Sequence, residues 1–279
     1  MKSEIIKVQL KDKKKVINFL KKNHKFKLTN KQYESLFNNN WSKNKKLGIA
    51  IKVNQEIVGF IGLLFSDNFF YLKTKIRIVN IHSWVVKKEF RYLSLSLLNQ
   101  LNDKGYVFVS QSTLLNLKDI FLKMGWKILD KNFYMIPFFF YCSKKISYNF
   151  NFQKSKNLKK FVKDHLEYNC KYMNINYGEL EIIFKLRKKK LIKFAEILFL
   201  SDINYFNKYI KSISKVLFKE YRVLIVKTDE RFLNNKNKNL YKLFKINYKT
   251  HLKVFRNSEN NQKIKSNYIS NLYSEFQLI

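Results

Sequence analysis

One stretch of the chain, residues 76–101, limits the possible folds more than any other. It reads IRIVNIHSWVVKKEFRYLSLSLLNQL, an apolar strand-like run followed by a basic joint at residues 87–92 and by an amphipathic helical pattern. The first turn of a helix leaves backbone N–H groups without partners, and the helix dipole adds partial positive charge there. A strand that enters a helix through a basic joint is therefore a common phosphate-binding arrangement. The stretch predicts a sheet covered by helices, with an anion site at the start of this helix.

The segments on either side of this stretch also alternate between strand and helix. Residues 47–53 and 56–65 are strand-like runs joined by Asn54-Gln55, which favours a hairpin because Asn tolerates a positive φ. Residues 66–70 are predicted as a loop. Further strands are predicted at residues 4–10, 106–110 and 126–129, and helices at residues 13–24, 31–37, 94–101 and 113–124, with Gly105 and Gly125 ending the last two helices. Antiparallel strands followed by a strand–helix–strand–helix order predict a mixed sheet flanked by helices.

A Lys-rich helical segment, residues 154–169, separates two parts of the chain in which the order of elements repeats. Beyond it we expect strands at residues 179–187, 191–200, 222–227 and 247–255, and helices at residues 203–220 and 239–244. FLKMGWKIL at residues 121–129 and YKLFKINYK at residues 241–249 occupy corresponding places, about 120 residues apart. We therefore predict an α/β protein with two lobes, residues 1–150 and residues 151–279, each a mixed, mostly antiparallel sheet flanked by helices.

The net charge of +36 is typical of a nucleic-acid-binding protein, but the composition argues against that class. Only six of the 56 basic residues are Arg, the residue that nucleic-acid surfaces use for bidentate contacts. Lysine is spread over the whole chain together with many Asn, Ile, Phe and Tyr, a mixture typical of an AT-rich coding genome. We therefore expect weak, salt-sensitive contact with polyanions and no specific nucleic-acid site.

The remaining composition argues against several other classes of protein. Two Cys residues, Cys142 and Cys170, are too few for a disulfide framework or a metal cage, and the four His residues are not at ligand spacing. Residues 1–15 contain no apolar signal-peptide core, and the longest apolar run, residues 133–142, is far shorter than a membrane span. We expect a cytoplasmic protein with a buried core, no membrane span and no metal.

Three segments together resemble the GNAT acyltransferase superfamily, and the resemblance covers most of residues 2–136. They are VGFIG at residues 58–62, WVVKKEFRYLSLS at residues 84–96 and FLKMGW at residues 121–126. In that family a V-x-P-x-x-R-x-x-G-x-G/A loop covers the pyrophosphate of acyl-CoA, and a later helix ends in a Y-x-K-x-G-F signature. The chain is also similar to two-lobed GNAT proteins of surface-polysaccharide biosynthesis, whose loop often reads Y-R-S-x-S. The resemblance thus implies two GNAT-like lobes.

The resemblance also implies an N-acyltransferase that moves an acyl group, most simply acetyl, from CoA to a small amine such as an amino sugar or a sugar nucleotide. The first lobe is expected to bind the donor, acetyl-CoA. Its contacts are expected from residues of the strand, the joint and the segments that follow: Trp84, Val85, Val86, Lys88, Arg91, Tyr92, Leu93, Ser94, Leu95, Ser96 and Asn116. The thioester would lie along the strand beside the candidate catalytic residues, His82 and Ser83.

The chain departs from the family pattern at the loop and at the position of the proton donor. Ser94 and Ser96 stand where two Gly residues usually stand, and serine cannot adopt Gly-only dihedral angles at low cost. Phe121 stands where many family members have a Tyr that protonates the leaving CoA thiolate. Phenylalanine has no proton to give, and the sequence leaves Tyr92, Tyr106 or water open as the replacement.

Several of these residues also have a purely structural interpretation. His82 has the intrinsic pKa of a general base, although a His packed on a sheet face is the commoner case. Ser110, Ser112 and Asn116 either contact the donor or belong to the start of the next helix. In the second lobe, Asp202 brings negative charge to a helix N-terminus, which opposes anion binding. We therefore predict that the second lobe is non-catalytic.

Two alternatives to an active enzyme remain open. One is a degenerate pair of GNAT-like lobes that binds a ligand or a partner without catalysis, which Phe121, Ser94 and Ser96 favour. The other is a basic protein associated with nucleic acid, which only the charge favours. The oligomeric state and the acceptor do not follow from the sequence.

Overall fold

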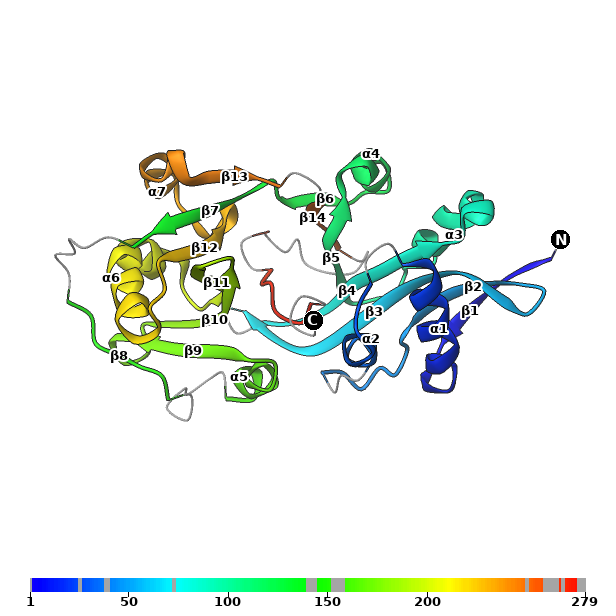
Figure 1. Cartoon of the computed structure of the whole chain (residues 1–279), viewed down its shortest axis with the longest axis horizontal. Helices are drawn as coiled ribbons and strands as arrows, with labels where there is room; N and C mark the ends of the chain where they lie inside the picture. The colour runs from blue at the N-terminus through cyan, green and yellow to red at the C-terminus, as the bar shows by residue number, and fades with distance from the viewer. Residues whose placement is uncertain are drawn as a thin grey trace.

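The structure, a computed structural model of the chain, describes residues 2–24, 27–37, 41–71, 74–138, 145–151, 159–248, 251–257, 266 and 269–274. Two mixed sheets lie side by side along the long axis of the molecule, and helices pack against each of them (Figure 1). The predicted α/β class with two lobes is confirmed. The first lobe contains the N-terminus, and the second lobe contains the long helix α6 (Ile203–Tyr221).

Each sheet has seven described strands, and only one neighbouring pair in each sheet is parallel. The first sheet has the order β1 (Ser3–Val8), β2 (Gly48–Val53), β3 (Glu56–Tyr71), β4 (Thr74–Val86), β5 (Tyr106–Leu114), β14 (His251–Asn257) and β6 (Lys127–Asp130). The second sheet has the order β8 (Tyr148–Asn149), β9 (Cys170–Ile175), β10 (Leu180–Lys189), β11 (Ile192–Leu200), β12 (Ile225–Asp229), β7 (Asn132–Pro137) and β13 (Lys245–Asn247). The parallel pairs are β4 with β5 and β11 with β12.

The side chains of β3 alternate between the two faces of the first sheet, and each face is covered by its own helices. Phe60 and Leu64 lie in one apolar core with residues of α1 (Lys13–Asn23) and α2 (Asn30–Ser35). Ile61 and Leu63 lie in a second core with residues of α3 (Ser94–Asn99) and α4 (Lys118–Lys123). The first sheet is therefore the central layer of its lobe. The remaining helices are α5 (Lys159–Leu166) and α7 (Asn235–Leu240) in the second lobe.

The two lobes repeat the same strand order but exchange one strand each. Along the chain β7 follows β6, yet it pairs with β12 and β13 in the second sheet. Similarly, β14 follows β13, yet it pairs with β5 and β6 in the first sheet. Each sheet is thus completed by a strand from the other part of the chain. The boundary at residue 150 stays a prediction about where the two units separate.

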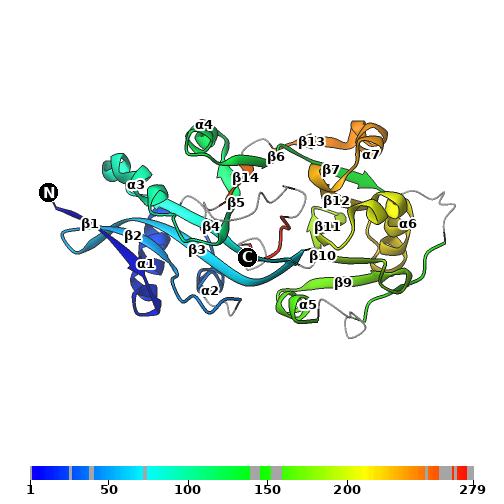
Figure 2. The ribbon, with the colours of Figure 1, turned by 180° about the vertical axis from the view of Figure 1, so that it is seen from behind.

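Side chains from both lobes and from the C-terminal segment form one shared apolar core. It includes Leu20 of α1, Cys170 of β9 and Tyr273 near the C-terminus. Trp41 packs edge-on against Tyr168 at 5.4 Å and against Tyr273 at 5.1 Å between ring centroids. Figure 2 shows the C-terminal segment between the two sheets. The lobes are therefore joined by packing, and not only by the chain that connects them.

Two strands are longer than the sequence predicts. Residues 66–70, predicted as a loop, belong to β3, because β4 pairs with β3 as far as Tyr71 and Thr74. The helix predicted at residues 113–124 begins only at Lys118, after a 3₁₀ turn, η3 (Leu115–Leu117). β5 continues to Leu114 because β14 pairs with it there. The predictions that residues 66–70 form a loop and that a helix begins near residue 113 are therefore wrong.

The turn predictions depend on fewer residues and are mostly confirmed. Asn54 and Gln55 form the hairpin turn with φ of +48° and +67°. Gly125 follows α4 with φ of +79°, so it ends that helix as predicted. Gly105, with φ of +78°, lies instead in the turn before β5, because α3 already ends at Asn99.

Candidate active site

The candidate site begins where β4 and β5 stop pairing. The two strands run parallel, and their register extends from Arg77–Tyr106 to Ile81–Ser110. Beyond these pairs β4 continues beside β3, whereas β5 continues beside β14. The parallel pair therefore opens into a fork, formed by residues 82–86 of β4 and residues 111–114 of β5. We call it the first fork.

A β-bulge lies at the base of the first fork. Gly62 pairs with His82 and Phe60 pairs with Val85, so Ser83 and Trp84 together face the single residue Ile61. Ser83 has a φ of +49°, a left-handed conformation that is rare for a residue with a side chain. A bulge leaves one residue out of the ladder and turns its backbone and side chain in a new direction. Strain of this kind is concentrated at functional positions.

His82, a predicted catalytic residue, is buried beside this bulge. Only 2% of its surface is exposed, and its ring packs edge-on against Phe37 of the first lobe. Nδ1 of His82 lies 3.1 Å from Oγ of Ser83, and Nε2 has no hydrogen-bond partner among the described residues. Burial lowers the pKa of His82 to about 3, with a smaller contribution from His24. The ring is thus neutral near pH 7 and does not store a proton.

The position of the family proton donor is occupied by a buried phenyl ring. Phe121 of α4 is 2% exposed and packs edge-on against Trp84 at 5.8 Å and Trp126 at 5.0 Å. The indole Nε1 of Trp84 is buried and has no hydrogen-bond partner among the described residues. A buried N–H group without a partner is costly, so an acceptor from a ligand would stabilise it.

Tyr106, one of the suggested replacements for the missing Tyr, lies at the wrong end of the strand pair. Ser110 is four positions further along β5, which corresponds to about 13 Å along a strand. Its hydroxyl group donates a hydrogen bond of 3.0 Å to Asp67, and burial raises the pKa of Tyr106. The structure therefore does not bring Tyr106 to the fork. Tyr92, by contrast, is 73% exposed in the joint.

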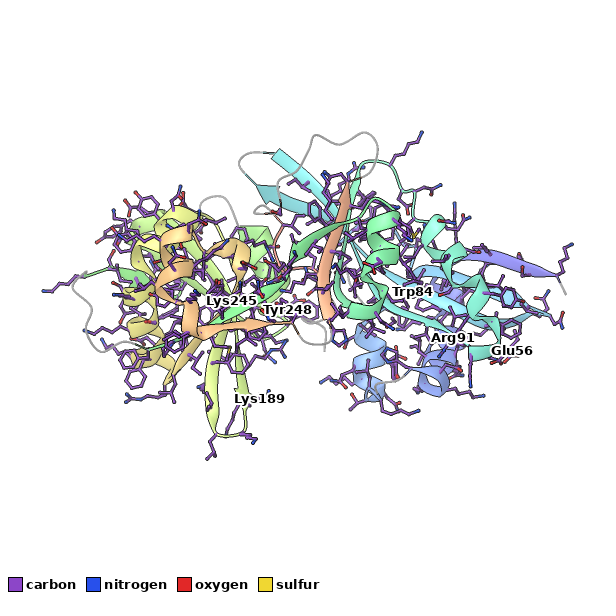
Figure 3. All side chains as sticks on the ribbon, turned by 90° about the horizontal axis from the view of Figure 1, so that it is seen from above. Glu56, Trp84, Arg91, Lys189, Lys245 and Tyr248 are labelled. Atoms are coloured by element: carbon purple, nitrogen blue, oxygen red, sulfur yellow. The ribbon has the colours of Figure 1, made fainter. Side chains whose placement is uncertain are left out.

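The basic joint forms a 3₁₀ helix, η2 (Lys88–Leu93), which continues directly into α3. The N–H group of Lys87 donates to the carbonyl group of Val58, and its side chain pairs with Glu56 at 2.6 Å, so the joint is fixed to β3. Lys88 and Arg91 are exposed and form no ion pair with a described residue. Figure 3 shows Glu56, Trp84 and Arg91 together on the first lobe.

The serine residues of the joint need no glycine-like conformation. Ser94 has φ of −60° and ψ of −40°, which are ordinary helical values. Its N–H group donates to the carbonyl group of Arg91, so this amide is already used within the helical turn. Ser96 is half-buried and Leu95 is 45% exposed. The segment is thus a helical start, and not an open glycine loop, and its two cations form no ion pair within the described ranges.

On the β5 side of the fork the structure favours a residue that the sequence reasoning missed. Gln111 is 3% exposed, and its Oε1 has no hydrogen-bond partner among the described residues. It lies in a second bulge, because Val254 pairs with Ser110 and Leu252 pairs with Thr113. Ser110 is engaged by the hydroxyl group of Thr113 at 2.8 Å. Asn116 is exposed in η3. No sequence signal identified Gln111, since the strand was predicted to end before it.

The second sheet has a corresponding fork, and the chain itself bridges it. β11 and β12 pair only from Phe194–Ile225 to Glu196–Lys227. Past this point the N–H group of Asn271 donates to the carbonyl group of Leu198 on β11 at 3.0 Å. The side-chain amide of Asn271 donates to Asp229 at the end of β12 at 2.5 Å. Asn271 of the C-terminal segment thus bridges the two strands. At the start of α6, Asp202 accepts a hydrogen bond from the N–H group of Tyr205, as an N-cap.

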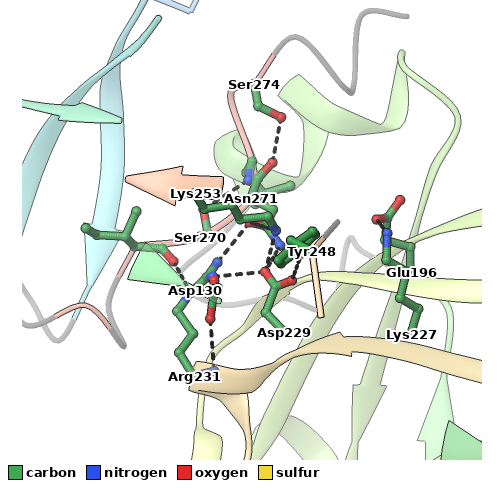
Figure 4. Close-up of polar contacts among 12 residues, drawn as sticks. Asp130, Glu196, Lys227, Asp229, Arg231, Tyr248, Lys253, Ser270, Asn271 and Ser274 are labelled. Carbon is green, nitrogen blue, oxygen red and sulfur yellow. Dashed lines mark hydrogen bonds and ion pairs between the residues drawn. The ribbon is translucent and has the colours of Figure 1, made fainter. Parts of the chain in front are cut away.

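Asn271 belongs to a buried charge cluster that connects the lobes (Figure 4). We define it as Asp130, Asp229, Arg231, Lys253 and Asn271. Asp229 lies 2.9 Å from Arg231 and 2.7 Å from Lys253, and Arg231 also pairs with Asp130 at the end of β6. Burial lowers the pKa of Lys253 to about 8 and that of Arg231 to about 9. The cluster joins β6 and β14 of the first sheet to β12 and the C-terminal segment.

The described residues contain no group of three His, Cys, Asp or Glu side chains that could hold a metal ion. Cys170 is a free, buried thiol whose pKa burial raises to about 11, and Cys142 lies outside the described residues. Within the same ranges, no helix is both long enough and apolar enough to cross a membrane.

No protein-family model and no curated protein matches the chain, but solved structures do. A GCN5-related N-acetyltransferase from Anabaena variabilis has a TM-score of 0.61 at 10% identity, over 91% of this chain and 72% of its own. A GCN5-related N-acetyltransferase from Kribbella flavida has a TM-score of 0.58 at 9% identity, over 91% and 70%. A protein from Pyrococcus horikoshii described as an acetyltransferase has a TM-score of 0.56 at 12% identity, over 97% and 95%.

At such low sequence identity, these matches are evidence for a shared fold and not for a shared activity. The match to the Pyrococcus protein covers nearly all of both chains, so it includes both sheets and the strands that they exchange. The forked parallel pair, followed by a basic strand–helix joint, lies within this shared architecture. The chain has the fold of the GCN5-related N-acetyltransferases, in two lobes.

Proposed function

We propose that the first lobe transfers an acyl group from acyl-CoA to a small amine. The observation that carries the proposal is the first fork. It combines a strained bulge at Ser83 with buried polar atoms and two adjoining cations, Lys88 and Arg91, for which the described residues offer no partner. The fold supports a donor of this type, since the solved structures that it matches are N-acetyltransferases.

The donor would bind with its pantetheine arm in the first fork and its pyrophosphate at the joint. Strand edges that have lost their partners offer backbone groups to the amides of the arm, and the Oε1 atom of Gln111 offers a further acceptor. Lys88 and Arg91 supply the charge for the pyrophosphate. Val85, Val86 and Leu93 supply apolar contact, and the N–H groups of Leu95 and Ser96 lie at the start of α3.

The proposed reaction is a direct attack of the neutral amine on the thioester carbonyl carbon. The N–C bond forms, the C–S bond breaks, CoA leaves as a thiolate and the nitrogen loses its extra proton to water. A backbone N–H group at the bulge of Ser83 and Trp84 would stabilise the negative charge on the carbonyl oxygen. The indole N–H group of Trp84 would donate to the leaving sulfur, since Phe121 cannot. The rest of the rate enhancement would come from holding the amine and the thioester in the correct relative position.

His82 and Ser83 are proposed to act as a pair in this reaction. With a pKa of about 3 the ring of His82 accepts a hydrogen bond but does not keep a proton. The 3.1 Å contact allows the Ser83 hydroxyl group to donate to Nδ1 of His82, which would fix that hydroxyl and leave its oxygen as an acceptor for the incoming amine. We therefore assign His82 to positioning and Ser83 to contact with the acyl group or the amine.

The finer details of the reaction are further proposals. We propose acetyl as the acyl group and an amino sugar or a sugar nucleotide as the acceptor, in the cytoplasm. The support for this acceptor is the resemblance of the joint to the Y-R-S-x-S loop of two-lobed GNAT proteins from polysaccharide biosynthesis. The second lobe is proposed to be non-catalytic, because Asn271 bridges the two strands of its fork and Asp202 caps α6.

A thermal-shift experiment with acetyl-CoA tests donor binding. A ligand that binds only the folded state raises its melting temperature, so acetyl-CoA should raise that of the wild type. Arg91→Glu should abolish the rise, because it replaces a cation of the joint by an anion. Lys15→Glu, on an exposed position of α1, is the matched control and should keep the rise. No shift of the wild type at millimolar acetyl-CoA would overturn the proposal.

The buried ring of Phe121 favours a second candidate, a ligand-binding protein without catalysis. The two candidates differ in thiol release. An active enzyme releases free CoA when acetyl-CoA is mixed with one member of a panel of amino sugars and sugar nucleotides. Binding of acetyl-CoA without release of CoA against the whole panel would favour the second candidate.

A further inference from the structure

The hairpin between β10 and β11 extends beyond the sheet to which it belongs. The pairing of β10 with β9 ends at Lys185, and the pairing of β11 with β12 begins at Phe194. Past Arg187 and Phe194 the two strands pair only with each other, at Lys188–Lys193 and Lys189–Ile192. Figure 3 shows this arm standing out from the second lobe, with Lys189 near its end. We define the arm tip as residues 188–193.

The arm tip is strongly basic, and none of its lysine side chains forms an ion pair with an acidic side chain in the described part of the chain. Lys188, Lys189 and Lys190 are exposed, and Lys193 follows two residues after the turn. No acidic residue occurs in the sequence between Glu181 and Glu196. Glu196 itself forms ion pairs with Lys227 at 2.6 Å and with Arg187 at 3.4 Å, in the body of the lobe. The tip therefore presents uncompensated positive charge at the end of a projecting element.

The tip also exposes aliphatic side chains. Leu191, in the turn, is 91% exposed and Ile192 is 46% exposed. Leu224 is a further exposed neighbour at 46%, since its N–H group donates to the carbonyl group of Lys193. Turns normally carry polar residues or glycine, so an exposed leucine here is poorly explained by folding. The arm tip therefore exposes aliphatic side chains together with the ammonium groups of the neighbouring lysine residues.

From this combination we infer that the arm tip docks on an anionic lipid surface. Leucine and isoleucine gain free energy by entering the boundary between headgroups and acyl chains, while lysine side chains reach the lipid phosphates. A nucleic acid would use the charge but not the aliphatic groups, because bases stack on aromatic rings and the tip contains none. A second copy of this chain is disfavoured by a net charge of +36 on each copy. The inference does not depend on the proposed transferase activity.

Vesicle co-sedimentation of the full chain tests this inference. The wild type should sediment with vesicles of phosphatidylcholine mixed with phosphatidylglycerol, and not with phosphatidylcholine alone. The double variant Lys189→Glu/Lys190→Glu should weaken binding at least roughly tenfold, because each surface lysine contributes about fivefold. The double variant Leu191→Ser/Ile192→Ser keeps every charge and should also weaken binding roughly tenfold. All four substituted side chains lie outside the core, so both variants should keep the wild-type melting temperature.

The matched control is Lys14→Glu/Lys15→Glu, which makes the same charge change on exposed positions of α1. It should bind vesicles nearly as well as the wild type. Equal losses in the control and in the arm variant would mean that only the total charge matters, and would overturn the inference. Full vesicle binding by Leu191→Ser/Ile192→Ser, with competition by RNA, would overturn it in favour of a polyanion site.

Discussion

At the scale of single residues, Gly62 determines whether β4 can place His82 against β3. A Cβ atom on Gly62 would lie 2.3 Å from Cε1 and from Nε2 of the His82 ring, far inside contact distance. The same substitution at Gly59 would bring a Cβ atom no closer than 3.3 Å to Ile51 and Val86. The ring of His82 thus occupies the space that a side chain at position 62 would need.

We expect Gly62→Ala to lower the free energy of unfolding by about 1–3 kcal/mol, because the added methyl group forces the ring or the strand to move. Gly59→Ala is the matched control in the same strand and should cost less. Urea unfolding measures both. In a His82→Ala background the cost of Gly62→Ala should largely disappear, and an undiminished cost would contradict the contact.

At the scale of elements, the sequence predicted correctly the helices and turns whose conformation is determined by residues close to them along the chain. The amphipathic period of α1 and the hairpin at Asn54 depend on neighbours along the chain, and both were predicted correctly. The length of β5 depends instead on β14, which lies far along the sequence, so the helix predicted at residues 113–124 began too early. No local pattern shows that β7 and β14 are exchanged between the sheets.

The same distinction applies to the candidate site: the features that neighbouring residues determine could be predicted, and those that distant residues determine could not. The joint and its strand could be located from the sequence, because a strand, a basic segment and a helix follow one another directly. The bulge at Ser83 could not be predicted, because it depends on the register in which β4 pairs with β3. The sequence also does not show that Gln111 is buried beside the fork or that Asn271 bridges the second fork, because both depend on partners distant in sequence. Ser94 and Ser96 stand where the family pattern has Gly, but both lie in a helical turn, so neither needs a Gly-only conformation.

The two forks lead to a prediction about stoichiometry. In the first fork β4 and β5 simply stop pairing, whereas in the second Asn271 forms hydrogen bonds to both strands. Isothermal titration of the wild type should therefore give one acetyl-CoA per chain. Two per chain would contradict the bridged second fork, and none would contradict the proposed donor site. Arg91→Glu should remove the single binding event.

At the scale of the whole molecule, the lobes are held together by apolar packing and by the buried charge cluster. The cluster has two anions, Asp130 and Asp229, against two cations, Arg231 and Lys253, so it is close to neutral as a unit. Charges taken out of water are stable only while every partner is in place. Because the four side chains come from both sheets, the loss of one partner should weaken the whole protein and not one lobe.

We expect Asp229→Asn to lower the free energy of unfolding by about 3–5 kcal/mol, because it leaves the ammonium group of Lys253 buried without its ion-pair partner. Glu56→Gln removes the same charge from the exposed pair with Lys87 and should cause little change, since exposed ion pairs contribute little. Urea unfolding followed by Trp fluorescence and by circular dichroism measures both variants. Since the cluster spans both sheets, the two signals should shift together in Asp229→Asn. A loss no greater than that of Glu56→Gln, or a shift in one signal alone, would mean that the cluster does not join the lobes.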